Sequence, residues 1–250
     1  MSTAFNRLIT RVAIPSVDSS CGMKLLPALL SVIAGSVDAI GFLGLEGLFT
    51  AHVTGNLVIL AAHLVNGGKA SVAKMLSVPV FVIALGLARL VAGGLELISR
   101  PSLRYLLLLQ LLLLAGFLTL SAIAGPRIVP DGPILILAGM FGVSAMGIQN
   151  ALVQISLKGA PSTAVMTTNI TRFMMDVGEV MLGREPDGVV RARTRAMRTW
   201  PAILGFAVGC GLGAGSEAAV GLRSLALPTG LALLALLTAL ASDSDGRQES

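Results

Sequence analysis

The chain has little charge and few cysteines, and both shortages narrow what it can be. Only 12% of its 250 residues are charged, 54% are hydrophobic, and the mean hydropathy is +0.86. These values exclude an ordinary soluble protein. Cys21 and Cys210 stand alone without a CxxC spacing, so neither a disulfide framework nor a metal site is expected.

The signatures of several common enzyme sites are also missing. The sequence has no GxSxG, HExxH or Walker A pattern. The two histidines, His52 and His63, would lie about 16 Å apart along a helix, too far to hold one metal ion. We therefore expect a protein that is not an enzyme and that uses no metal and no cofactor.

What the chain has instead is a series of apolar runs of about 20 residues, the length that crosses a hydrocarbon layer. Eight runs can be drawn, at roughly 25–45, 49–66, 76–98, 103–125, 133–157, 162–183, 199–220 and 222–242. The sequence predicts an all-α polytopic membrane protein with eight hydrophobic helical segments: six clear spans and two short polar ones, 49–66 and 162–183. The net charge of +5 then indicates the positive-inside bias of membrane proteins rather than nucleic-acid binding.

The two short segments share a pattern, which indicates an internal repeat. Thr-Gly-Asn at 54–56 returns as Thr-Thr-Asn at 167–169, and residues 56 and 169 are 113 positions apart. We expect two related four-segment repeats, 25–125 and 133–242. A cytoplasmic N-terminal segment, 1–24, precedes them, and a polar tail, 243–250, follows them.

Polar residues at the middle of these two segments are costly in lipid, so they should face protein, water or a ligand. At helical spacing they form one stripe in each segment, and we predict a site between the stripes near mid-membrane. Asp38 of the first span and Asn150, which aligns with it in the second copy, should lie beside them. The candidate binding residues are Asp38, Thr54, Gly55, Asn56, His63, Asn150, Thr167, Asn169, Arg172 and Asp176.

The charged groups within the spans are expected to pair. An unpaired acid at this depth costs on the order of 2.5–3.5 kcal/mol. We predict that Asp38 lies near Arg89 or Arg172, and that Asp176 sits one helical turn from Arg172 on the same face.

The number of crossings stays open between two models. If all eight runs cross, the repeats are parallel; if the two short segments only dip in, each repeat crosses three times and the halves are inverted. Basic residues divide between the two sides equally well in both models. The glycine, asparagine and threonine content of the short segments, poor for helices, favours the inverted model.

Two features of the second copy predict its surroundings. The stretch from Arg184 to Arg198 carries five arginines, which predicts a charged loop facing the cytoplasm. Gly205, Gly209 and Gly213 follow at four-residue spacing, which predicts close packing against another helix.

The stretch from Ala34 to Asn56, AGSVDAIGFLGLEGLFTAHVTGN, resembles the signature of the YoaK-type bacterial inner-membrane proteins, a family catalogued as a domain of unknown function. GIQN at 147–150 and TTNIT at 167–171 look like its second motif. Thr168 stands where that motif usually has glycine, so a backbone role for Gly55 should not be copied there. The resemblance covers nearly the whole chain after residue 24. It implies a multi-span protein of the bacterial inner (plasma) membrane, without an established substrate.

Two main functions compete. A small-solute or ion transporter explains the repeats, the central polar residues and the intramembrane charges together. A scaffold, assembly or lipid-binding protein would use the same polar residues as contacts between helices. The expected partners are membrane lipid and a small-molecule or ion substrate, with no nucleic acid.

Overall fold

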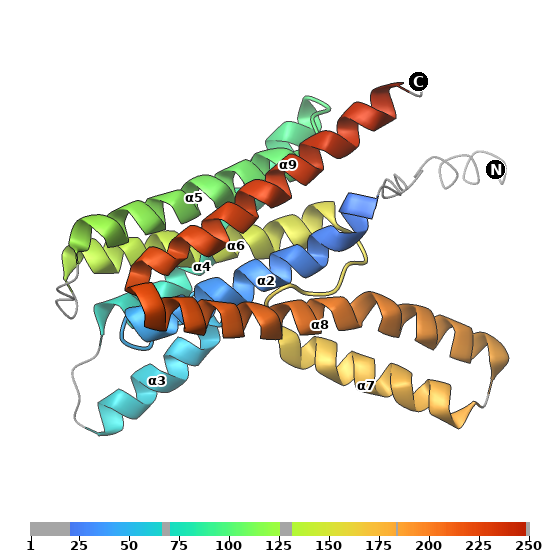
Figure 1. The fold of residues 1–250 in the computed structure, drawn as a ribbon, viewed down its shortest axis with the longest axis horizontal. Coiled ribbons are helices and arrows are strands. Elements are labelled where there is room, and N and C mark those ends of the chain that lie inside the picture. Colours follow the sequence, from blue (N-terminus) through green and yellow to red (C-terminus); the bar gives the residue numbers. More distant parts are fainter. Residues whose placement is uncertain (1–20, 67–70, 126–131, 184, 249–250) are drawn as a thin grey trace, which may run out of the picture.

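Helices form the regular structure of the chain (Figure 1). The computed structural model describes residues 21–66, 71–125, 132–183 and 185–248, and these contain no strand, which confirms the all-α class. The helices are α2 (Cys21–Gly44), α3 (Val53–Val65), α4 (Val72–Leu97), α5 (Ser102–Ala124), α6 (Pro133–Ser156), α7 (Met166–Leu182), α8 (Pro186–Val220), the 3-10 helix η1 (Gly221–Leu225) and α9 (Ala226–Gln248). Most of the predicted N-terminal segment, and Arg184, lie outside the described residues.

Five described stretches are long and apolar enough to cross a membrane: 25–44, 72–97, 102–124, 133–156 and 186–242. The last of them contains both α8 and α9, which η1 separates. Helix α3 has 13 residues and α7 has 17, both short of the roughly 20 needed for a crossing. The described chain therefore holds fewer candidate spans than the eight predicted runs.

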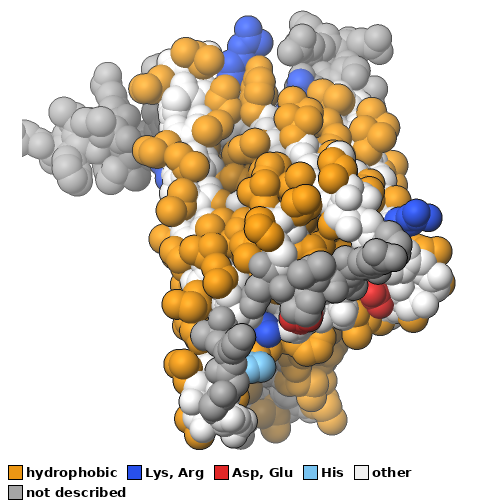
Figure 2. Space-filling view, turned by 90° about the vertical axis from the view of Figure 1, so that its left-hand side faces the viewer, with side chains coloured by type: hydrophobic (Ala, Val, Ile, Leu, Met, Phe, Trp, Pro, Cys, Tyr) orange, Lys and Arg blue, Asp and Glu red, His pale blue; other side chains and the backbone are white. Residues whose placement is uncertain are grey.

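Apolar side chains cover much of the outer surface. Figure 2 shows one face on which hydrophobic side chains predominate and charged side chains are few. Leu90 of α4 is 72% exposed and Leu97 is 88% exposed. Such a surface would drive association in water, whereas it is well solvated by lipid.

Helices α2 and α8 pack side by side through glycines. A Cβ atom added at Gly205 would lie 2.7 Å from the carbonyl oxygen of Ala28, and one at Gly213 would lie 2.6 Å from that of Ser36. These distances leave no room for a side chain, so the predicted close packing of this glycine series is confirmed. The residue numbers rise together along both helices, which shows that α2 and α8 are parallel.

The remaining long helices are arranged in two groups. Helix α2 packs against α8 and α9, whereas α6 packs against α4 and α5. The two groups meet where α5 contacts α9 and where α2 contacts α6. Gln149, near the end of α6, donates a hydrogen bond of 2.9 Å to the carbonyl of Leu30, in the first half of α2. Helices α2 and α6 therefore run antiparallel, as Figure 1 shows.

The two short helices occupy matching places. Each follows a connection without α-helix, 45–52 before α3 and 157–165 before α7. In Figure 1 both helices begin near the middle of the molecule and run outward in opposite directions. Helix α3 packs against α4, and α7 packs against the first half of α8.

The predicted charged loop before the seventh run is wrong. Helix α8 begins at Pro186, so the arginines from Arg191 to Arg198 lie on its second to fourth turns. Proline suits the first turn of a helix and arginine is a good helix former. Arg195 is also held by Asp176 of α7, at 2.6 Å, which favours a helical hairpin over a loop.

Candidate functional site

Asp38 of α2 is a buried acid around which the first connection folds. It is 4% exposed, and its Oδ1 accepts hydrogen bonds from the backbone amides of Thr50 and Ala51, at 2.7 and 2.8 Å. The Thr50 hydroxyl donates to the same oxygen at 3.3 Å. Because these amides point to a carboxylate, the connection stays non-helical and α3 begins only at Val53. The carboxylate thus satisfies backbone amides that have no helical hydrogen-bond partner in the interior of the protein.

The second oxygen of Asp38 contacts a histidine. Nδ1 of His52 lies 2.7 Å from Oδ2 of Asp38. This hydrogen bond raises the pKa of His52 above its ordinary 6.5, although burial acts in the opposite direction. The predicted arginine partners of Asp38 are wrong, because Arg89 pairs with Glu96 of its own helix at 3.3 Å and Arg172 lines a separate cavity beside α7 and α8. His63, the histidine expected at the site, is exposed on the outer part of α3.

Asn56 fixes the start of α3 to the same connection. Its Oδ1 accepts a hydrogen bond from the amide of Phe49, and its Nδ2 donates to the carbonyl of Phe49, at 2.9 and 2.8 Å. Its Nδ2 also donates to the hydroxyl of Ser77 in α4, at 2.9 Å. A Cβ atom at Gly55 would lie 3.0 Å from the Phe49 ring, so glycine allows this ring to lie close. The predicted asparagine is thus a positioning residue for the loop.

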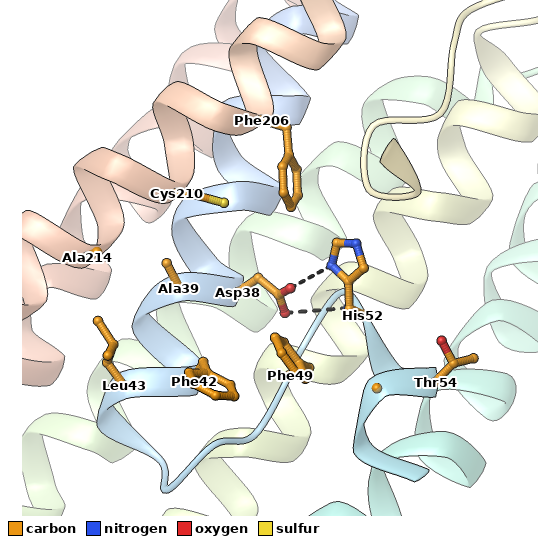
Figure 3. A pocket seen from close by; sticks show the side chains of 11 residues that line it. Asp38, Ala39, Phe42, Leu43, Phe49, His52, Thr54, Phe206, Cys210 and Ala214 are labelled. Atoms are coloured by element: carbon orange, nitrogen blue, oxygen red, sulfur yellow. Dashed lines mark hydrogen bonds and ion pairs between the residues drawn. The ribbon is translucent and has the colours of Figure 1, made fainter. Parts of the chain in front are cut away.

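A cavity of about 620 Å³ lies beside the Asp38–His52 pair (Figure 3). Its walls come from α2, the 45–52 connection, the start of α3 and α8. The lining residues are Asp38, Ala39, Phe42, Leu43, Phe49, His52, Thr54, Gly55, Phe206, Cys210 and Ala214. Its volume is within the range of small-molecule sites, about 300–1,000 Å³.

The second connection is held by an amide rather than an acid. The side chain of Gln149 is fully buried, and its Nε2 donates to the hydroxyl of Thr163 at 2.9 Å as well as to α2. Its Oε1 accepts a hydrogen bond of 2.7 Å from Gln110 of α5. Asn150, predicted as the counterpart of Asp38, instead donates to a carbonyl one turn earlier in its own helix. Gln149 therefore takes the position that sequence alignment assigned to its neighbour.

Asn169 holds the second connection as Asn56 holds the first. Its Nδ2 donates a hydrogen bond of 2.6 Å to the carbonyl of Ser162, seven residues earlier. The bond from Asn56 to Phe49 has the same separation. Both asparagines are almost fully buried.

A second cavity, of about 410 Å³, lies beside α7 and α8. Its lining residues are Gly159, Ala160, Pro161, Asn169, Thr171, Arg172, Met175, Asp176, Arg195, Arg198 and Thr199. Arg195 donates from Nε and Nη2 to Oδ1 of Asp176, at 2.9 and 2.6 Å, and reaches Glu179 at 3.3 Å. Asp176 and Arg172 line this cavity together, as expected, but the ion pair of Asp176 is with Arg195.

The candidate residues are divided between two places rather than joined in one. The two cavities share no lining residue: the first contains Asp38, Thr54 and Gly55, and the second contains Asn169, Arg172 and Asp176. Thr167 is exposed on α7 outside both. The prediction of a single site requires the two polar stripes to meet near mid-membrane. The structure instead anchors each asparagine to its own connection.

Sequence reasoning missed three contributors. His52 lies inside the AHVTGN stretch, but from the sequence it is considered only as a possible metal ligand with His63. Its separation of 14 residues from Asp38 gives no helical pattern. Phe206 reaches the first cavity from α8, far along the chain. Gln149 stands next to Asn150 in the sequence. An alignment that pairs Thr163 with Thr50, the threonines bonded to Gln149 and Asp38, could have identified Gln149 as the counterpart of Asp38.

Comparison with known proteins places this geometry in a family. The model of a family described as "Protein of unknown function (DUF1275)" matches residues 26–238. The chain belongs to this family. The UPF0700 transmembrane protein YoaK of Bacillus subtilis (strain 168) is 32% identical over 155 residues, which cover 61% of this chain and 66% of that protein, just under two thirds. No solved structure matches the chain. Together with the apolar helices, the transmembrane relative shows a multi-pass membrane protein.

Proposed function

We propose that the protein is a small-solute or ion transporter of the bacterial inner membrane. The observation that carries this proposal is the contact between the buried Asp38 and the half-buried His52 beside a cavity, at a connection that leaves the helical pattern inside the body of the protein. Ionisable groups and unwound backbone are costly at membrane depth. Transporters keep such features where substrate and coupling ions bind.

We further infer that the chain forms two inverted repeats with six crossings. If α2 is equated with α6, α4 with α8 and α5 with α9, the packing of α2 on α8 becomes that of α6 on α4, and the packing of α2 on α9 becomes that of α6 on α5. The equated helices α2 and α6 run antiparallel, as inversion requires. The seven-residue asparagine bonds at 56 and 169 support the same equivalence.

In this arrangement the two short helices enter from opposite sides of the membrane. With a cytoplasmic N-terminus, α2 ends outside, and the connection 45–52 returns from there to the depth of Asp38. The connection 157–165 enters from the cytoplasm, next to the arginines of α8. Matched interrupted segments of this kind are typical of transport sites between inverted repeats.

One feature favours the alternative of an assembly or lipid-binding protein. The hairpin of α7 and the first half of α8 exposes Met175 at 71% and Met181 at 82%, near the arginines from Arg191 to Arg198. Apolar and basic side chains side by side suit a membrane surface or a partner helix. This feature lies in the second half and leaves the acid and cavity of the first half without a role.

Uptake of labelled solute by the purified protein in proteoliposomes, with a trapped pH-sensitive dye to report proton movement, tests the proposal. Amines, carboxylates and neutral sugars are applied in turn. For at least one class, uptake should exceed that of protein-free liposomes, and His52→Gln should lower it by 10-fold or more. Asn150→Ala, which removes a bond within α6, should leave uptake unchanged. Equal uptake by the wild type and His52→Gln, or no class taken up above the protein-free level, would contradict transport through this cavity.

A further inference from the structure

The charge of the first cavity restricts what it can hold. Asp38 is the one acid among the eleven lining residues, and no lysine or arginine is among them. The nearest buried lysine, Lys74, donates to the carbonyl of Glu46 in the connection instead. When His52 is neutral the lining therefore carries one negative charge, which disfavours anions and favours cations.

Aromatic rings surround this charge. Phe42 and Phe49 have ring centroids 4.7 Å apart, Phe49 and His52 are 6.3 Å apart, and His52 and Phe206 are 5.4 Å apart. Three of the eight phenylalanines of the chain line this one cavity. Figure 3 shows Phe206 and Phe49 on opposite sides of the His52–Asp38 contact. Ring faces attract cations within about 6 Å of the centroid, and an organic ammonium ion also gains from apolar walls.

The two oxygens of Asp38 have different tasks. Oδ1 holds the backbone amides of the connection, whereas the hydrogen bond to Oδ2 comes from His52. A cation that approaches Oδ2 therefore meets the His52 ring and leaves the loop anchored. A protonated His52 already supplies the positive charge that such a cation would bring, so proton and cation are alternatives at one carboxylate.

We propose that the first cavity binds a small organic ammonium ion beside Oδ2 of Asp38, and that this ion and a proton on His52 exclude one another. The inference rests on the proposed function, because it names the substrate class of that site. Binding at a pH where His52 is charged releases the His52 proton to solvent. Movement of the cation in one direction would then be coupled to a proton in the other.

Other groups near His52 leave this competition intact. Cys210 of α8 lines the cavity as a thiol, and α3 contributes the neutral Thr54. Helix α6 approaches the connection through glycines, Gly139 and Gly142. On α8, Glu217 lies beside Gly44 at the end of α2, and on α4 Lys74 is engaged by the connection. Asp38 is therefore the one charged group among the described residues that bonds to the ring.

Three probes of one shape test the charge preference. Cyclohexylammonium, cyclohexanol and cyclohexanecarboxylate are titrated calorimetrically into the full-length protein in nanodiscs, with empty nanodiscs as the partition control. Cyclohexylammonium should bind at least 10-fold more tightly than cyclohexanol, and the carboxylate more weakly than either. The affinity for cyclohexylammonium should fall by up to 10-fold for each unit by which the pH lies below the pKa of His52. This fall should vanish in His52→Gln.

A phenylalanine variant keeps the test independent of Asp38, whose replacement endangers folding. Phe206→Leu should weaken cyclohexylammonium binding by roughly 3- to 30-fold and change cyclohexanol binding less. Phe141→Leu is the matched control, because Phe141 packs beside Gly116 away from the cavity. An equal loss of cyclohexylammonium affinity in both variants would show that the rings act through packing alone and would overturn the proposal.

Binding and flux separate this inference from the proposed function. Preference for the neutral or anionic probe, no binding of cyclohexylammonium, or an affinity independent of pH would overturn the cation site, even if another solute class were taken up. Selective and pH-dependent cation binding without uptake of any solute would support the cation site and contradict transport.

Discussion

The two halves of the molecule hold their short helices in the same way but surround them with opposite chemistry. In both, a buried asparagine bonds to a carbonyl seven residues earlier, and a polar side chain of the preceding helix holds a threonine of the connection. In the first half that side chain is the carboxylate of Asp38; in the second it is the amide of Gln149. The first cavity has one acid and three phenylalanines, and the second has three arginines and one acid.

This difference distinguishes the contacts that stabilise the fold from the residues that could bind a ligand. The asparagine bonds and the helix pairing are common to both halves, so we assign them to the stability of the fold. Each cavity has one acid, but the histidine and the aromatic rings line the first cavity alone, so a specific ligand is expected there. In the proposed transporter, a pathway between the cavities would present different charges at its two ends.

Removing the anchor of each connection should produce the largest effects, and they should be unequal. Asp38→Ala strands two backbone amides and His52, and should lower the free energy of unfolding by about 3–5 kcal/mol. Gln149→Ala strands neutral groups and should cost about 1–3 kcal/mol. Unfolding in dodecyl sulfate titrations measures both. Equal losses would remove the distinction between a charged and a neutral anchor.

The asparagines should show a smaller contrast in the same assay. Asn56→Ala removes three hydrogen bonds and should cost about 2–3 kcal/mol, whereas Asn169→Ala removes one bond to a carbonyl and a long contact with the Met166 sulfur and should cost about 1 kcal/mol. The matched control is Asn150→Ala on α6. A larger loss at Asn169 than at Asn56 would break the equivalence of the two halves as we describe it.

The effect of pH should be the smallest and should appear in the first half alone. The folded state raises the pKa of His52 above 6.5, so its ion pair with Asp38 stabilises the protein fully below pH 6.5. That stabilisation is lost as the pH rises through the raised pKa. The difference in melting temperature between wild type and His52→Gln should therefore shrink from pH 6 towards higher pH. No histidine lines the second cavity, so Asp176→Asn should give a difference that varies less over this range.

The span pattern made the fold class predictable, because runs of apolar residues report directly on a hydrocarbon environment. The residues at which individual helices begin were harder to predict from the sequence. The start of α3 at Val53 depends on Asp38 attracting the amides of Thr50 and Ala51, a contact that spans two elements. Helix α8 begins at Pro186, and the arginines behind it belong to this helix, where Arg195 meets Asp176 of α7. A run of charged residues predicts that the segment is exposed to solvent, but it does not indicate whether the segment is a helix or a loop.

The site was predictable in its residue types and less so in its partners. Asp38 and Asn56 were identified because polar groups are rare in such segments. Their partners are backbone groups and His52, which periodicity does not reveal. Gln149 and Asn150 are one residue apart, which is a rotation of about 100° around the helix, so the two side chains meet different neighbours. Depth along a helix can be counted from sequence, whereas the direction of approach of α8 and its Phe206 cannot.

Cys210 offers the most direct test that the first cavity is a solute site open to the outer side of the membrane. It lines that cavity, and Cys21→Ser leaves it as the single thiol of the chain. Intact cells are treated with a cationic, membrane-impermeant methanethiosulfonate or with its anionic counterpart, with Cys210→Ala as the control. We predict that Cys210 is modified from outside and that the cationic reagent reacts faster. Modification by membrane-permeant maleimide alone, with neither charged reagent reaching the thiol, would contradict the account.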